Sequence, residues 1–164
     1  MKQRFETTVG KRMGVETAFV TLYVGLDTFR PVESEDPRKH QLHTEYWDLS
    51  EETVEAISRS RAEGRRIIAV GTTAVRVLEQ VALLSDAAGH PELRPGSGWA
   101  DLFILPGHRF RLVDAMVTNF HLPRSTLLML VSAFAGRFPI LHAYQDAVQQ
   151  SYRFYSFGDG MVIL

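Results

Sequence analysis

The pattern of apolar and polar residues in the first half of the chain predicts alternating strands and helices. Residues Thr17–Gly25 are rich in β-branched and aromatic side chains, which favour a strand. Ser50, followed by two glutamates, is typical of a helix start, and Gly64 of a helix end. The short apolar run Arg66–Val70 then stops at Gly71, as a buried parallel strand does.

Apolar residues recur at helical spacing after Gly71, so this segment predicts a strand–glycine–helix unit of the α/β type. The residues that form the apolar face of this helix are Ala74, Val75, Leu78, Val81 and Ala82. Residues 85–100 contain three glycines and two prolines and therefore predict a loop, as does the charged, proline-containing segment 30–40.

The second half of the chain predicts further strands around tight turns. Pro106-Gly107 is expected to join two of them as a hairpin, and a glycine-rich turn at 158–160 to join the last two. The expected strands are Asp101–Leu105, Arg109–Val113, Ala115–Val117, Arg153–Phe157 and Met161–Leu164.

Two helices are predicted between these strands. Ser125 or Thr126 is expected to cap a buried helix that runs through Ala135, and Pro139 fits the first turn of the next helix. The apolar face of the second helix is expected to comprise Ile140, Ala143, Tyr144, Ala147 and Val148. Together the elements predict one α/β domain over residues 1–164, with a mixed sheet and flanking helices.

Composition narrows the classes of function. The 164 residues carry 45% hydrophobic and 23% charged residues, as globular domains do. A formal net charge of −1 provides no overall attraction to nucleic acid, so an RNA contact would need a local cluster of arginines and lysines. The absence of cysteine excludes disulfides and thiolate chemistry. The longest apolar run, Leu127–Ala135, is too short to span a bilayer, and no export signal is evident, so we expect a cytoplasmic protein.

Residues 118–126 (Thr-Asn-Phe-His-Leu-Pro-Arg-Ser-Thr) hold the densest set of reactive groups. Hydroxyls, an amide, an imidazole and a guanidinium directly precede an apolar segment. A loop that is held by a rigid element behind it commonly carries binding or catalytic groups. A capped helix with polar surface residues explains the same pattern, so local features leave both interpretations open.

Residues 71–76 (Gly-Thr-Thr-Ala-Val-Arg) follow a strand and open a helix. Free amides at a helix N-terminus, together with two hydroxyls, suit a carboxylate or a phosphate. The segment lacks the further glycines or the lysine of known nucleotide-binding loops. A capped helix without a ligand is therefore the more common explanation of this segment taken alone.

Two further segments combine aromatic and ionisable residues. In an extended chain His43, Glu45 and Trp47 share one face, and Glu45 suits general acid/base catalysis or a ribose hydroxyl. A half-exposed strand is the alternative, and no histidine spacing indicates a metal site. Residues 152–155 (Tyr-Arg-Phe-Tyr) suit base stacking with a phosphate contact from Arg153. Alternating aromatic residues equally suit packing on the two faces of a strand, and we expect such packing for Phe154.

Five segments occur in an order that resembles one family, the S-adenosylmethionine:tRNA ribosyltransferase-isomerases of queuosine biosynthesis. The resemblance runs from about residue 15 to the C-terminus, and 118–136 is its most continuous part. The matching segments are 24–32 (VGLDTFRPV), 43–46 (HTEY), 69–76 (AVGTTAVR), 118–136 and 152–159 (YRFYSFGD).

The resemblance implies an enzyme that uses S-adenosylmethionine as a co-substrate and needs no metal. Such an enzyme transfers and isomerises the ribosyl part of S-adenosylmethionine onto 7-aminomethyl-7-deazaguanine in tRNA. The products are epoxyqueuosine in the tRNA, adenine and methionine. The proposed chemistry of the family begins with removal of a proton from the 5′ carbon beside the sulfonium.

The resemblance also suggests roles for particular residues. His121 is the first candidate for proton transfer, with Glu45 and His43 second. Thr118 and Asn119 are candidates for binding ribose or adenine edges. The remaining candidates for substrate binding are Gly71, Thr72 and Thr73 for the methionine carboxylate, and Arg76, Arg124 and Arg153 for a carboxylate or a tRNA phosphate.

The chain departs from the family pattern in two ways. Tyr23 stands where the first motif usually has His, and Asp27 where it has a second Gly. The family's β-barrel domain and N-terminal half are expected to be absent, so the chain resembles the C-terminal part of the α/β domain. We expect contact with that missing half or self-association. A truncated or degenerate module that binds S-adenosylmethionine or tRNA without catalysis is the alternative function.

Overall fold

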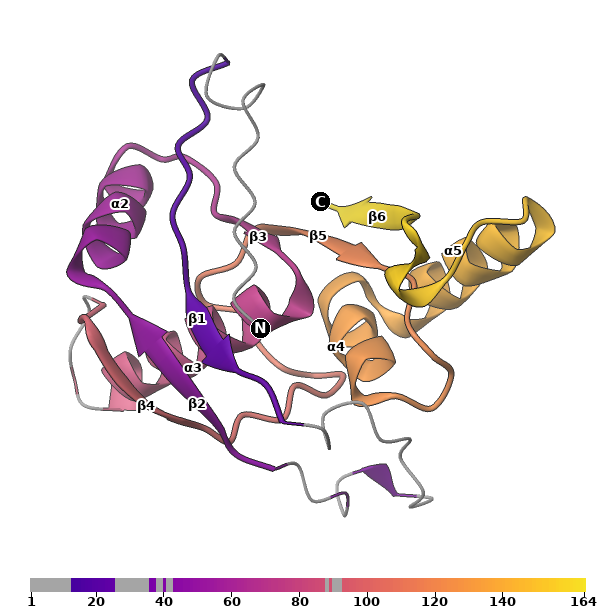
Figure 1. The fold of residues 1–164 in the computed structure, drawn as a ribbon, viewed down its shortest axis with the longest axis horizontal. Coiled ribbons are helices and arrows are strands. Elements are labelled where there is room, and N and C mark those ends of the chain that lie inside the picture. The colour runs from indigo at the N-terminus through magenta and orange to yellow at the C-terminus, as the bar shows by residue number, and fades with distance from the viewer. Residues whose placement is uncertain (1–12, 26–35, 38–39, 41–42, 88, 90–92) are drawn as a thin grey trace.

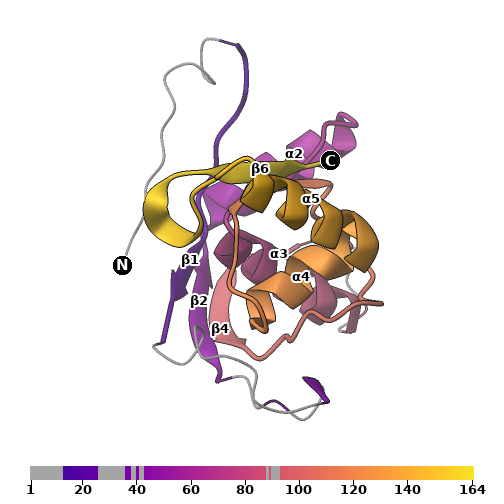
Figure 2. The same ribbon diagram turned by 90° about the vertical axis from the view of Figure 1, so that its right-hand side faces the viewer.

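Two three-stranded sheets lie on either side of one central helix. The structure, a computed structural model, describes residues 13–25, 36–37, 40, 43–87, 89 and 93–164, and all statements below refer to these. One sheet has the strand order β1-β2-β4 and the other β3-β5-β6. Figure 1 shows both sheets with helix α3 between them, and Figure 2 shows helices α4 and α5 on the side of α3 away from β1-β2-β4. The predicted α/β class is confirmed, with two sheets in place of one.

The first sheet is antiparallel and buries one face. It contains β1 (Thr21–Tyr23), β2 (Glu45–Leu49) and β4 (Gly96–Ala100). Along β2, buried and exposed residues alternate, as expected for a strand with one covered face. The predicted strand at 17–25 is therefore confirmed in its centre only.

Strand β4 corrects the prediction of a loop through residues 85–100. Its glycines weaken the local preference for a strand, but pairing with β2 overrides that preference. Gly98 also has a packing reason, because a Cβ atom there would lie 3.2 Å from the Trp47 ring. The other face of this sheet exposes a row of rings, Tyr23, Tyr46 and Trp99, with adjacent centroids 5.9 and 5.3 Å apart. The expected self-association stays a prediction.

The second sheet is mixed. Strands β3 (Ile68–Val70) and β5 (Ala115–Asn119) are parallel, and β6 (Gly160–Ile163) pairs with β5 in the antiparallel sense. The predicted parallel strand is confirmed, but only Ala69 is buried, and Ile68 and Val70 are exposed. One face of β3 therefore lies against the core and the other faces outward.

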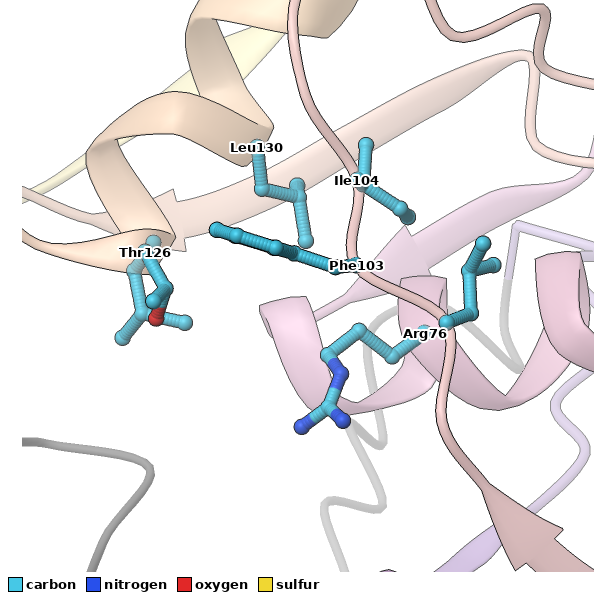
Figure 3. A pocket seen from close by; sticks show the side chains of 7 residues that line it. Arg76, Phe103, Ile104, Thr126 and Leu130 are labelled. Atoms are coloured by element: carbon cyan, nitrogen blue, oxygen red, sulfur yellow. The ribbon is translucent and has the colours of Figure 1, made fainter. Parts of the chain in front are cut away.

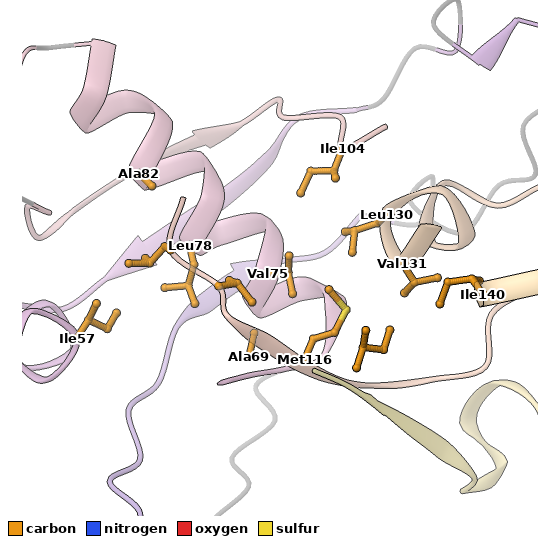
Figure 4. Packing of buried hydrophobic residues seen from close by; sticks show 13 residues of the cluster. Ile57, Ala69, Val75, Leu78, Ala82, Ile104, Met116, Leu130, Val131 and Ile140 are labelled. Atoms are coloured by element: carbon orange, nitrogen blue, oxygen red, sulfur yellow. The ribbon is translucent and has the colours of Figure 1, made fainter. Parts of the chain in front are cut away.

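Helix α3 (Thr72–Ala87) contributes to both hydrophobic clusters of the protein. Val75, Leu78 and Ala82 join the larger cluster, which Figure 4 shows between α3, β5 and α4. Val77 and Val81 join the smaller cluster beneath the first sheet. A helix that is apolar on two faces must lie in the interior, and this one does.

The polar residues of α3 explain why the predicted hairpin at 101–113 is wrong. Glu79 is fully buried, and its carboxylate accepts hydrogen bonds from the amides of Arg111, Leu112 and Val113 at 2.8–3.0 Å. Gln80 Oε1 accepts from the amides of residues 101 and 102. These amides bind side chains of α3 instead of a partner strand, and only the turn after Leu105 remains, closed by the amide of residue 108.

The remaining helices begin where the sequence predicts. Ser50 caps α2 (Glu51–Ala62), and Ser125 caps α4 (Thr126–Ala135) through the amide of residue 128. Helix α5 (Arg137–Gln149) follows directly, although Ala143 and Val148 of its predicted apolar face are exposed. In the described part of the chain, no single helix satisfies the length and hydropathy of a membrane span; only α4 and α5 together do, by length and composition alone, with a bend of 116°.

The predicted strand at 153–157 is wrong, because a 3₁₀ turn, η3 (Tyr155–Phe157), takes its place. Tyr155 has a positive φ of 63°, and its amide donates to the Phe120 carbonyl. Its carbonyl accepts from Asn119 Nδ2 at 2.7 Å, so neither group is available for a strand ladder. Asp27 and most of the predicted 30–40 loop lie outside the described residues.

We expect Glu79→Ala to lower the free energy of unfolding by roughly 3–5 kcal/mol, because it leaves buried amides without acceptors and creates a cavity. Urea denaturation measures the change. Glu55→Ala, at an exposed position of α2, serves as the control and should stay within about 0.5 kcal/mol of the parent. Equal stability of the two variants would show that Glu79 does not hold the 101–113 segment.

Candidate functional site

Three predicted segments meet at the carboxyl end of β5. The Gly71 amide donates to the Val117 carbonyl at 2.8 Å, so the turn after β3 lies beside the start of the 118–126 loop. Strand β6 begins there too, since Gly160 pairs with Asn119. A Cβ atom at Gly160 would lie 2.8 Å from the Thr118 carbonyl oxygen, so this approach requires glycine. The carboxyl ends of parallel strands are the usual location of ligand sites in α/β sheets.

The Gly71 turn begins α3 without a side-chain cap. Gly71 has a φ of 89°, and its carbonyl accepts from the amides of Ala74 and Val75. Thr72 is buried and Thr73 is exposed. The amides of the first helical residues have no partner within the helix. Binding of a carboxylate or a phosphate at this helix N-terminus therefore stays a prediction.

Glu45 and Arg76, predicted as separate site residues, form a buried ion pair. Arg76 Nη1 donates to Glu45 Oε2, and Glu45 Oε1 accepts from the Gly25 amide at 3.0 Å. Both side chains are almost fully buried. Glu45 is therefore engaged in fixing the guanidinium and the end of β1, which favours a positioning role over that of a mobile base.

His121 lies in the interior beside Thr118. The sequence predicts both residues for the same candidate site. Its Nε2 lies 3.0 Å from Thr118 Oγ1, and its backbone amide donates to the Tyr144 hydroxyl at 2.7 Å. Burial lowers the pKa of His121 from 6.5 to about 4 and raises the pKa of the Tyr144 hydroxyl. The imidazole is consequently neutral at pH 7.

The other predicted residues lie at the surface. Asn119 holds the Tyr155 segment, as described above, and His43 and Arg124 are exposed. Arg153 forms a bidentate pair with Asp159, with Nε–Oδ2 and Nη2–Oδ1 distances of 3.0 and 3.1 Å. The Arg153 guanidinium and amide hold the pKa of Asp159 at about 2, and that carboxylate raises the pKa of Arg153.

The packing prediction for Phe154 is confirmed. Its ring centroid lies 5.2 Å from that of Phe120 and 5.8 Å from that of Tyr144. Phe120 belongs to the 118–126 loop, so these rings pack against that loop. Tyr152 lies at the edge of the same cluster and is 45% exposed.

A small pocket lies between the 71–76 segment and the 118–126 segment, which carry most of the predicted site residues. It lies between α3, the 102–104 segment and the start of α4, and Figure 3 shows Arg76 and Thr126 on opposite sides of it. The residues that line it are Arg76, Leu102, Phe103, Ile104, Thr126, Leu127 and Leu130. Of residues 71–76, only Arg76 lines it. Within the described ranges, no group of three His, Asp or Glu residues is placed to hold a metal ion.

Sequence reasoning missed several residues that position this site. Glu79 and Gln80 were not predicted, although with Arg76 they form a polar stripe at i, i+3 and i+4 within the stretch 74–84 of α3, whose other residues are all apolar. That stripe was a usable signal. Tyr144 was predicted only as a core residue, and its hydroxyl gave no local sign of its bond to the His121 amide.

The lowered pKa of His121 predicts a pH dependence of stability. The unfolded chain takes up this proton near pH 6.5, whereas the folded protein takes it up near pH 4. Stability from the neutral imidazole is therefore complete above pH 6.5 and is lost as the pH falls towards 4, by up to roughly 1.4 kcal/mol per pH unit. Urea unfolding of the parent and of His121→Gln should show this difference in slope. The exposed control His142→Gln should keep the parent slope.

Comparison with known proteins identifies the family. Residues 5–163 match the model of a family described as queuosine biosynthesis protein. A relative from Symbiobacterium thermophilum, an S-adenosylmethionine:tRNA ribosyltransferase-isomerase, is 58% identical over 92% of this chain and 43% of its own length. The homologous enzyme of Caldanaerobacter subterraneus is 53% identical over 94% of this chain and 44% of its own length.

A crystal structure supports the same assignment. The S-adenosylmethionine tRNA ribosyltransferase of Thermotoga maritima superposes with a TM-score of 0.65 and 53% identity, over 73% of this chain and 41% of that one. The chain thus spans less than half the length of the curated relatives that it matches. On sequence and on fold, the chain belongs to the queuosine biosynthesis protein family.

Proposed function

We propose that this chain takes part in transferring and isomerising the ribosyl part of S-adenosylmethionine to 7-aminomethyl-7-deazaguanine in tRNA. The products are epoxyqueuosine-tRNA, adenine and methionine. The observation that carries the proposal is the 58% identity over 92% of the chain to an enzyme named for this activity. Because the proposed substrate is tRNA, we propose the cytoplasm as the location of the reaction.

The convergence of segments at the end of β5 supports a division of roles. His121 is neutral at pH 7 and is held beside Thr118, so it is available to accept a proton. The sulfonium beside the 5′ carbon acidifies its proton, which lowers the basicity that the neutral imidazole must supply. Thr118 orients the imidazole, and Asn119 lies at the same edge for contacts with ribose or adenine. The Gly71–Thr73 turn also lies there, and its predicted ligand is the methionine carboxylate.

The other predicted residues are proposed to contact tRNA or to act as second candidates for catalysis. Arg124 is exposed at the turn before α4, where a phosphate can reach it. Arg153 is paired with Asp159, so a phosphate would have to share it. His43 remains a second candidate for proton transfer at the surface. The alternative function, a binding module without catalysis, draws support from Tyr23, which is 63% exposed where the family pattern has His.

Incubation with S-adenosylmethionine and tRNA that carries 7-aminomethyl-7-deazaguanine tests the reaction. We expect adenine and epoxyqueuosine to appear in equal amounts, measured by chromatography of the small molecules and mass spectrometry of the tRNA nucleosides. Binding of S-adenosylmethionine without adenine release would establish the binding module instead. Absence of both binding and release would reject the two functions together.

His121→Ala tests the role of the imidazole. General acid/base catalysis contributes about 10²–10⁴-fold, so we expect adenine release to slow by that factor while the affinity for S-adenosylmethionine changes little. His142→Ala, on the exposed side of α5, is the matched control and should retain the parent rate. An unchanged rate in His121→Ala would remove His121 from the mechanism.

A further inference from the structure

The guanidinium of Arg76 has hydrogen-bond donors left over. One terminal nitrogen, Nη1, binds Glu45, but Nε and Nη2 have no partner in the described part of the chain. The residue is only 5% exposed. Buried donors on a charged group are costly when unsatisfied, and in native proteins they indicate a ligand or a specific function. The free edge of Arg76 therefore requires an acceptor.

The start of helix α4 lies across the pocket from that edge. Thr126 and Leu127, its first two residues, line the pocket together with Arg76. Ser125 satisfies the amides of residues 128 and 129 through its side chain and its carbonyl. The amides of Thr126 and Leu127 have no partner within the helix, and no acidic residue lies in the first turn.

The charge and the lining residues of the pocket favour a carboxylate. Glu45 neutralises one edge of Arg76 and fixes its orientation, so the other edge presents two donors in a plane. The remaining lining is apolar and includes Leu102, Phe103 and Ile104. A planar anion on a short aliphatic chain fits this lining better than an extended, fully solvated phosphate backbone.

We propose that Arg76 and the N-terminus of α4 form the subsite for the α-carboxylate of S-adenosylmethionine, with its methylene groups against the 102–104 segment. This inference rests on the proposed function and refines it. It places the carboxylate at α4 and leaves the Gly71–Thr73 turn for another part of the substrate. Gln80, by holding the amides of residues 101 and 102, positions the wall of this subsite.

Calorimetry with S-adenosylmethionine and with decarboxylated S-adenosylmethionine tests the subsite. Charge-assisted hydrogen bonds predict that the parent chain prefers the carboxylated ligand by about tenfold or more. In Arg76→Met we expect this preference to disappear, so that the two ligands bind with about equal affinity. Arg111→Met removes the same charge from a partly exposed ion pair with Asp86 and should keep the preference.

A second pair of variants avoids the loss of the Glu45 partner. Proline is well tolerated at the first helical position, and Ser125 already has the extended backbone that precedes proline, with ψ at 152°. Thr126→Pro therefore removes an amide donor, and Thr126→Ala controls for the side chain. We expect the preference for the carboxylated ligand to be about fivefold smaller in Thr126→Pro than in Thr126→Ala.

Several results would overturn the subsite. They are equal affinity of the parent for both ligands, no binding of either, or a preference that survives in Arg76→Met and Thr126→Pro. If these variants instead weaken tRNA binding and flatten its salt dependence while the preference is kept, the anion is an RNA phosphate. Adenine release is measured separately, so loss of turnover with the preference intact would reject the proposed function and leave the subsite standing.

Discussion

The burial of helix α3 between two sheets is the constraint on which the rest of the structure depends. Its apolar residues join both hydrophobic clusters, so each sheet packs against the same helix. The helix also carries Arg76, Glu79 and Gln80 into the interior, where each must find partners. Those partners are the β2 carboxylate of Glu45 and the backbone of residues 101–113, which have no strand ladder of their own.

The same constraint connects stability to the candidate site. Glu79 accepts hydrogen bonds from three backbone amides and lies 3.4 Å from His108 Nε2, and Gln80 Oε1 accepts from two backbone amides, so both residues serve the fold. Arg76, one turn earlier on the same stripe, has partners for only part of its guanidinium within the described ranges, and it lines a pocket. A buried polar group with donors left over is tolerated where a ligand supplies the missing acceptor. Polar side chains of α3 whose hydrogen bonds are satisfied thus stabilise the fold, whereas the one with donors left over is the candidate for binding a ligand.

His121 differs from Arg76 because its contacts, and not a missing partner, define its state. Its side chain contacts Thr118 and its backbone amide donates to the Tyr144 hydroxyl, and burial keeps the imidazole neutral. The cost of charging it in the interior is the physical reason for its low pKa and for its neutral state at pH 7. Its neighbours come from β5 and α5, which only the folded chain brings together.

Elements governed by local chemistry were predictable to within a few residues. The caps at Ser50 and Ser125 and the glycine between β3 and α3 act on their own neighbours, so their positions are visible in the sequence. Elements governed by distant partners were not. Strand β4 forms despite its glycines because β2 pairs with it, and residues 101–113 are held by α3 instead of by each other.

The sequence by itself determined the α/β class, the family resemblance and the segments that carry chemistry, because periodicity and motif order are properties of the linear chain. The tertiary structure decided which of those residues meet. It paired Glu45 with Arg76, left part of that guanidinium without a partner among the described residues, and lowered the pKa of His121. Burial and pairing depend on side chains that are far apart in the sequence, so no local pattern could have specified them.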